Sequence, residues 1–182
     1  LLPEQESLCD DRNVSLSKFL IRTRLASESL VNIALAIVTD ANDGLEPNTP
    51  ARSLLEEVAR VGKISVETLM EGIVDQSGFP YIPLENYDVD RHIVRVLPKG
   101  LCFSRLVVPF DVLSHTILIA TANPFEALGA RTIEKLLDYN LQWYLAAPAA
   151  IVNVLCDTHR IPRPVHGMGS EIPHVRLPRA GN

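Results

Sequence analysis

The stretch ILIATANPF at residues 117–125 decides the fold of the chain. Together with the preceding Thr116, its first part up to Thr121 is rich in branched apolar residues and predicts a β-strand. Asn123-Pro124 then predicts the start of a helix, because proline is preorganised for the first helical position. Residues 106–112 have the same strand-forming composition, and the intervening residues 113–115 predict a β-hairpin.

The segments around this hairpin predict a small α/β subdomain over residues 79–160. The helix that starts at Asn123-Pro124 is expected to run to Tyr139-Asn140, followed by a strand at 141–145. Ala147-Pro148 predicts a last helix that ends near His159. Before the hairpin, Tyr81-Ile82 lies between two prolines and predicts a short edge segment, and short helical pieces are expected at 90–97 and 98–104. The subdomain should contain a mixed sheet of three to four strands and two helices.

Residues 1–78 predict two copies of a helical hairpin. Leu16, Phe19 and Leu20 follow the i, i+3, i+4 spacing of an apolar helix face. Ser27 and Ser65 are predicted N-caps, and Gly62 is predicted to end a helix in the left-handed conformation. Residue 15 aligns with residue 53 and residue 35 with residue 73, so the two copies keep a constant offset. Neither copy buries its apolar face alone, and we expect the hairpins to pack together as an N-terminal bundle. The predicted fold class is therefore α+β.

Composition limits the classes of partner and compartment. The chain has 182 residues, of which 47% are hydrophobic and 21% charged, as in ordinary globular proteins. A net charge of −5 without a basic cluster argues against nucleic acid. The three cysteines form no CxxC pair, which favours a reducing, cytoplasmic location. No apolar run reaches the ~18 to 20 residues that span a bilayer, so no direct membrane insertion is expected. Residues 161–182 are rich in proline and glycine and predict a linker or tail.

The motifs of catalysis and metal binding are missing from the sequence, and we expect no enzyme activity and no metal. Gly62-Lys63 is followed by Ile64, so a phosphate-binding P-loop is absent. Cys156 and His159 have a C-x-x-H spacing without the second ligand pair that a structural zinc site needs. The carboxylates of Glu56-Glu57 are predicted on a solvent face. Trp143 and Tyr144 are neighbours on a strand, so one is expected in the core and the other nearer to solvent.

Four segments in this order carry a family resemblance: QSGFPYIPL (76–84), Val108-Pro109-Phe110, ILIATANPF (117–125) and LAAPAAIVNVL (145–155). Over roughly residues 15–160 the chain resembles the N-terminal domain of type II secretion and type IV pilus assembly ATPases. The resemblance implies a non-catalytic docking or regulatory domain without a cofactor, attached to a motor domain in the full-length chain. The implied partner is the cytoplasmic domain of an inner-membrane platform protein, which would hold the protein at the inner membrane.

One branch of this family binds cyclic di-GMP through two repeats of an RLGxxL…G…L…Q pattern, and related copies accompany glycosyltransferases. In the second hairpin Leu54, Gly62, Leu69 and Gln76 match this pattern, but its Arg and first Gly are replaced by Ser53 and Leu55. In the first hairpin the corresponding departures are Ser15, Ser17, Arg24 and Val38. Serine cannot supply the bidentate contacts of arginine. The alternative function is therefore a cyclic di-GMP sensor, with Arg52, Leu54, Gly62, Leu69 and Gln76 as its candidate site residues.

Overall fold

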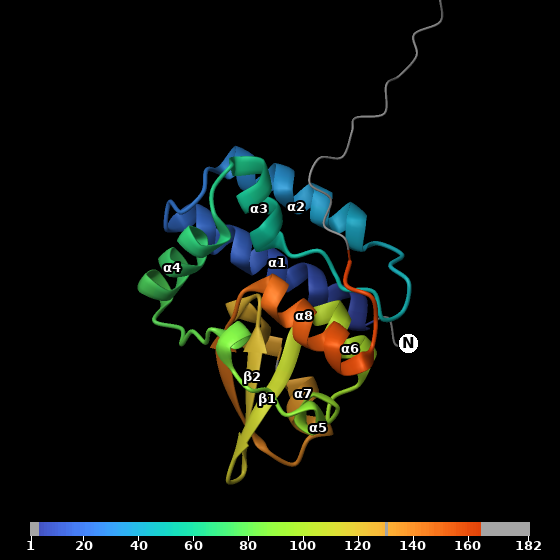
Figure 1. Ribbon diagram of the computed structural model, residues 1–182. Coiled ribbons are helices and arrows are strands. Elements are labelled where there is room, and N and C mark those ends of the chain that lie inside the picture. Colours follow the sequence, from blue (N-terminus) through green and yellow to red (C-terminus); the bar gives the residue numbers. More distant parts are fainter. Residues whose placement is uncertain (1–3, 130, 165–182) are drawn as a thin grey trace, which may run out of the picture.

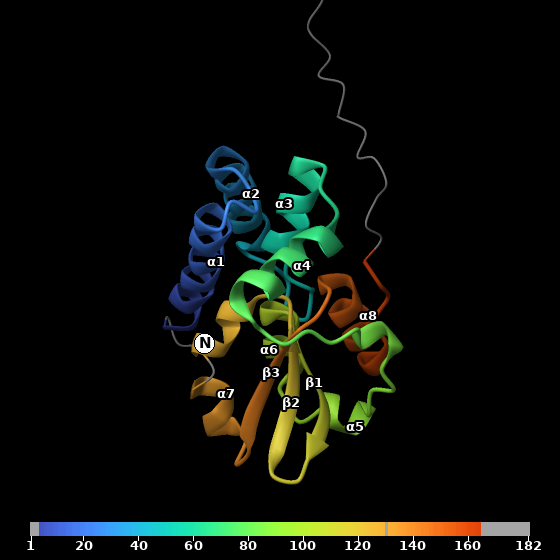
Figure 2. The ribbon, with the colours of Figure 1, turned by 90° about the vertical axis from the view of Figure 1, so that its left-hand side faces the viewer.

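The computed structural model describes residues 4–129 and 131–164 of the chain. Figures 1 and 2 show helices α1 to α4 gathered at one end of the molecule and the sheet at the other. The predicted α+β fold, with helices first and a sheet-containing part after them, is confirmed. The first four helices are α1 (Glu4–Arg22), α2 (Glu28–Asn42), α3 (Leu54–Gly62) and α4 (Val66–Ser77).

Serine caps fix where three of these helices begin. The hydroxyl oxygens of Ser27, Ser53 and Ser65 each accept a hydrogen bond from the backbone N–H three residues later, which satisfies one free amide of the first turn. The predicted caps Ser27 and Ser65 are confirmed. The prediction for Gly62 is wrong, because Gly62 is the last helical residue of α3 and Lys63 takes the left-handed position with φ 52°.

The bundle has its own apolar core, to which both hairpins contribute. Two aligned pairs are buried in both copies, Leu16 with Leu54 and Leu20 with Val58. A Cβ placed on Gly72 would lie 2.3 Å from Leu25 Cδ2, so glycine at this position permits α4 to approach the end of α1 closely.

The sheet contains β1 (Val107–Leu113), β2 (Thr116–Thr121) and β3 (Asn140–Leu145), in that order. β1 and β2 form the predicted antiparallel hairpin, and β3 pairs with β2 in parallel, so the sheet is mixed. The predicted edge segment is also confirmed. Tyr81 forms a bridge to Leu145, with Ile82 N donating to Leu145 O at 2.9 Å and Leu145 N donating to Pro80 O at 2.7 Å.

Short helices surround the sheet. The predicted continuous helix from Pro124 to Tyr139 is wrong, because the segment divides into a 3-10 turn, η2, and a separate helix, α7. The Asn123 side-chain oxygen accepts from Phe125 N, and Glu126 N donates to Asn123 O three residues back, which sets the tighter geometry of a 3-10 turn. The remaining elements are η1 (Leu84–Asn86), α5 (Arg91–Val94), α6 (Lys99–Arg105), η2 (Pro124–Gly129), α7 (Arg131–Leu136) and α8 (Pro148–His159).

A second apolar core lies around the sheet and includes Phe103, Phe110 and Ile119. Trp143 belongs to this core, while Tyr144 is only half-buried, as the alternation of a strand predicts. Leu145 packs with the bundle core instead, so the end of β3 connects the two cores. Of the predicted tail, residues 165–182 lie outside the described residues.

Candidate functional site

Of the five candidate residues of the nucleotide pattern, two are buried, two are exposed, and Gly62 is partly buried. Leu54 and Leu69 are 2% and 1% exposed and pack in the bundle core. Arg52, before α3, and Gln76, on the last turn of α4, are exposed. A Cβ on Gly62 would lie 2.7 Å from Leu30 Cδ2. The glycine is thus explained by the close packing of α3 against α2, without a ligand.

Arg52 is held by its backbone and by a buried carboxylate. Its N–H donates to Asn42 Oδ1 at 2.7 Å, and its carbonyl accepts from Asn42 Nδ2 at 3.1 Å. Its guanidinium lies 3.8 Å from Glu57 Oε2. Glu57 also accepts from Arg60, and this hydrogen bond raises the pKa of Arg60. The prediction that Glu57 lies on a solvent face is wrong, since only 3% of it is exposed.

The departures from the nucleotide pattern have structural roles in the bundle. Ser53, at the pattern's arginine position, is buried as the N-cap of α3. Leu55, at the first glycine position, is fully buried in the bundle core. In the first hairpin, Arg24 takes the position of the middle glycine and adopts φ 58°, a conformation that glycine reaches at lower cost. In the second hairpin the left-handed residue is Lys63, one position after the aligned Gly62, so the two copies place this conformation one residue apart.

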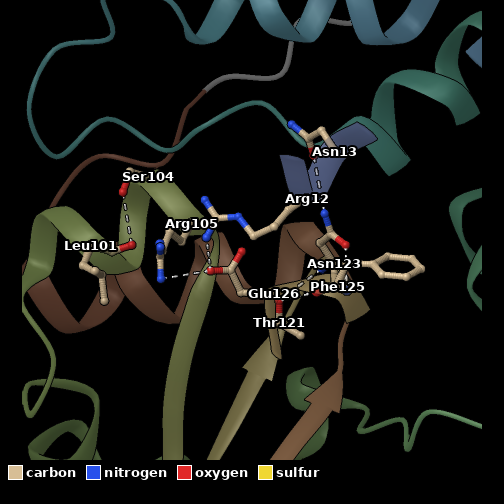
Figure 3. A network of polar contacts seen from close by, with 9 residues as sticks. All are labelled: Arg12, Asn13, Leu101, Ser104, Arg105, Thr121, Asn123, Phe125 and Glu126. Carbon is tan, nitrogen blue, oxygen red and sulfur yellow. Dashed lines mark hydrogen bonds and ion pairs between the residues drawn. The ribbon is translucent and has the colours of Figure 1, made fainter. Parts of the chain in front are cut away.

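Sequence reasoning gave no role to a buried ionic cluster of Arg12, Arg105 and Glu126, shown in Figure 3. The three residues come from α1, α6 and η2, and they are only 6%, 9% and 2% exposed. Glu126 Oε1 lies 2.5 Å from Arg12 Nη1 and 3.3 Å from Arg105 Nη1. Burial raises the pKa of Glu126, while the two guanidiniums oppose this rise. The cluster ties the first helix of the bundle to the sheet-containing part.

The same contact continues along α1 through the end of the ILIATANPF stretch. Figure 3 shows the Asn123 side chain turned toward Asn13, with Asn123 Nδ2 and Asn13 Oδ1 3.5 Å apart. Thr121 Oγ1 holds the turn by hydrogen bonds of 3.1 Å to the backbone N and O of Asn123. The Phe125 ring packs edge-on against Phe19, with ring centroids 5.8 Å apart. The turn after β2 is therefore the docking point for α1.

The two residues of the C-x-x-H spacing lie against apolar or aromatic neighbours. Cys156 is a buried free thiol, and the His159 ring lies against Phe103 with centroids 6.0 Å apart. In the part of the chain that the structure describes, no three His, Cys, Asp or Glu side chains gather to hold a metal ion. Within residues 4–129 and 131–164, no helix has the length and apolar character needed to cross a bilayer.

His159 gives a prediction for the pH dependence of stability. Burial, together with Lys99 and Arg95, lowers the pKa of His159, so the folded state disfavours the protonated imidazole. We expect the free energy of unfolding to fall as the pH drops below 6.5, because the unfolded state then binds the proton first. The slope cannot exceed about 1.4 kcal/mol per pH unit for one proton. Urea unfolding between pH 7.5 and 5.5 measures this slope.

Two variants assign the slope to this residue. His159→Gln should remove the part of the slope that comes from His159, while His115→Gln should leave it unchanged because His115 is exposed. An unchanged slope in His159→Gln would contradict the assignment.

The chain is similar to several known proteins. Residues 77–158 match the MshEN domain family. The type IV pilus assembly ATPase PilB of Myxococcus xanthus (strain DK1622) is 26% identical over 94 residues, which are 52% of this chain and 17% of PilB. The chain thus spans less than a fifth of that relative.

Two solved structures match most of the chain. The structure of MshE with cdg matches with a TM-score of 0.54 at 20% identity, over 79% of this chain and 97% of that one. The N-terminal domain of XpsE matches with a TM-score of 0.47 at 14% identity, over 78% and 93% of the two chains. The match of residues 77–158 to the MshEN domain family and the similarity to PilB confirm the predicted kinship with the N-terminal domains of type II secretion and type IV pilus assembly ATPases.

Proposed function

We propose that the chain is a non-catalytic docking and regulatory domain of a secretion or pilus-assembly ATPase-type protein. Its partner in this proposal is the cytoplasmic domain of an inner-membrane platform protein, which holds the protein at the cytoplasmic side of that membrane. The MshEN match and the similarity to PilB support the proposal. The proposal includes a motor domain attached to this chain. It also divides the chain into three units, residues 1–78, 79–160 and 161–182.

The preference for docking over nucleotide binding rests on the residues that occupy two positions of the nucleotide pattern in the bundle. The position that needs a free arginine holds Ser53, whose hydroxyl caps α3 and is buried. The position that needs a glycine holds Leu55, which fills the core. A dinucleotide phosphate is recognised by exposed, planar donors, and neither residue offers one. The surface of the bundle therefore lacks these phosphate contacts, and we assign it to contacts with a protein.

Calorimetry with the cytoplasmic domain of the cognate platform protein tests the docking function. We expect saturable binding with a dissociation constant in the range of about 1–10 μM, as for a transient interface of ordinary size. The absence of binding at about 500 μM would count against the proposal.

A second candidate function is the binding of cyclic di-GMP. The structure of MshE with cdg shares the fold of this chain, and Arg52 and Gln76 are both exposed on the helical part. Arg52 stands one residue from the position of the pattern's arginine, and Glu57 already holds its guanidinium at 3.8 Å. Nucleotide binding would therefore require Arg52 to give up that contact for a phosphate.

Titration with cyclic di-GMP separates the two candidates. The docking proposal predicts no saturable heat at about 100 μM nucleotide. The second candidate predicts binding that Arg52→Ala and Gln76→Ala each weaken at least about tenfold, the effect of about 1.4 kcal/mol. Arg91→Ala is the control, because Arg91 is an exposed arginine on α5, outside the bundle.

A further inference from the structure

A groove lies between the segment that contains η1 and helix α8. It encloses about 380 Å³. Tyr87, Glu85 and Asp88 line it from one side, and Asn153 and Asp157 of α8 line it from the other. We call this cavity the Tyr87 groove. In Figure 2, α8 and the segment before α5 lie side by side at the edge of the sheet-containing part.

Tyr87 forms a fixed aromatic wall of the groove. Tyr87 is 38% exposed, and its ring packs edge-on against Phe110 with centroids 5.2 Å apart. Phe110 is fully buried and packs in turn against Tyr144 at 5.6 Å. The Tyr87 hydroxyl donates to Asp111, and this bond raises the pKa of Tyr87. A tyrosine held in this way loses little conformational freedom when a partner packs on it.

The charges around the groove favour a cationic partner. Arg163 is engaged by Asp157, with its Nη2 2.7 Å from Oδ2 and 2.9 Å from Oδ1. Within the described residues, Glu85 and Asp88 have neither a hydrogen bond nor an ion pair. Arg91 is the remaining cation of the lining. The groove thus offers two free carboxylates beside an exposed aromatic ring, which together attract an arginine or lysine side chain.

From this geometry we propose that the Tyr87 groove binds a basic, extended segment of the platform protein's cytoplasmic domain, with an arginine or lysine side chain placed over Tyr87 and beside Glu85 and Asp88. The proposal rests on the docking function and names the surface and partner chemistry that serve it. The alternative occupant is the chain's own segment 165–182, which follows the groove residue Arg163 and contains Arg176 and Arg179.

Calorimetry of the full chain with that cytoplasmic domain tests the surface. Tyr87→Ala is expected to weaken binding at least about tenfold, as for a central interface aromatic. Tyr87→Phe keeps the ring and should stay within about twofold of wild type. Glu85→Lys with Asp88→Lys should weaken binding about tenfold at low salt and less in high salt, because salt screens exposed charges.

Matched controls lie outside the groove. Tyr139→Ala removes a tyrosine of similar exposure, 42%, and Asp40→Lys reverses an exposed charge on α2. Both should bind like wild type. If wild type binds and the groove variants bind equally well, the surface assignment is wrong while the docking function stands. If removing residues 165–182 shifts the NMR signals of Tyr87 in the chain alone and leaves its affinity for the platform domain unchanged, the tail is the occupant and the proposal is overturned.

A peptide probe tests the partner chemistry without the platform protein. An octapeptide of alternating valine and arginine should perturb the NMR signals of Tyr87 and Tyr144, and the same peptide with glutamate for arginine should not. If the arginine peptide binds there while the platform domain does not bind at all, the docking function fails and the groove's preference for basic segments stands. If the arginine peptide leaves these signals unchanged, the groove proposal fails.

Discussion

Replacing Glu126 with alanine is expected to lower the free energy of unfolding by about 3–5 kcal/mol. Glu126 is the shared carboxylate of Arg12 and Arg105, and all three side chains are at least nine-tenths buried. Its removal leaves two guanidiniums close together in a medium that solvates them poorly, and their mutual repulsion adds to the cost. Urea unfolding followed by the fluorescence of Trp143, the single tryptophan, measures the loss.

Two further variants separate this electrostatic cause from a general loss of packing. Glu134→Ala removes an exposed carboxylate from α7 and should change stability by less than about 0.5 kcal/mol. The triple variant Arg12→Met, Arg105→Met, Glu126→Leu replaces the buried charges with apolar side chains of similar size, and it should recover most of the loss. If this variant is as unstable as Glu126→Ala, the unpaired charges are not the cause.

Replacing Leu55 with glycine, the residue of the nucleotide pattern, is expected to cost about 3–6 kcal/mol and to melt the bundle first. Leu55 is fully buried between the two hairpins, so its removal leaves a cavity that costs about 2–5 kcal/mol. Glycine inside a helix adds about 1 kcal/mol. Hydrogen exchange of the amides of α2 and α3, together with urea unfolding, measures this effect.

Leu55→Ala isolates the cavity, because it keeps the helix propensity of α3. The difference between the alanine and glycine variants should be near 1 kcal/mol. If Leu55→Gly is tolerated within about 1 kcal/mol, the leucine is not required by the core, and the argument against nucleotide binding loses its main support. These outcomes connect the stability of the bundle to the choice between the two candidate functions.

The candidate site shows where sequence reasoning succeeded and where it stopped. It placed Leu54 and Leu69 on apolar helix faces, and both are buried as that spacing indicates. It placed Glu57 on a solvent face, whereas the structure buries this carboxylate between Arg52 and Arg60. A polar side chain on a helix can be buried only when a nearby group pairs with it. The periodicity of apolar residues in the sequence does not reveal that partner.

The sequence by itself determined the local elements of this protein. The ILIATANPF stretch specified a strand and the helical turn after it, and Ser27 and Ser65 specified where two helices begin, because these signals act over a few residues. Only the tertiary structure decided that Arg12 meets Glu126, residues that are 114 positions apart. It also decided that Tyr87 stands exposed beside a cavity, since burial and charge pairing depend on contacts between segments that are distant in the chain.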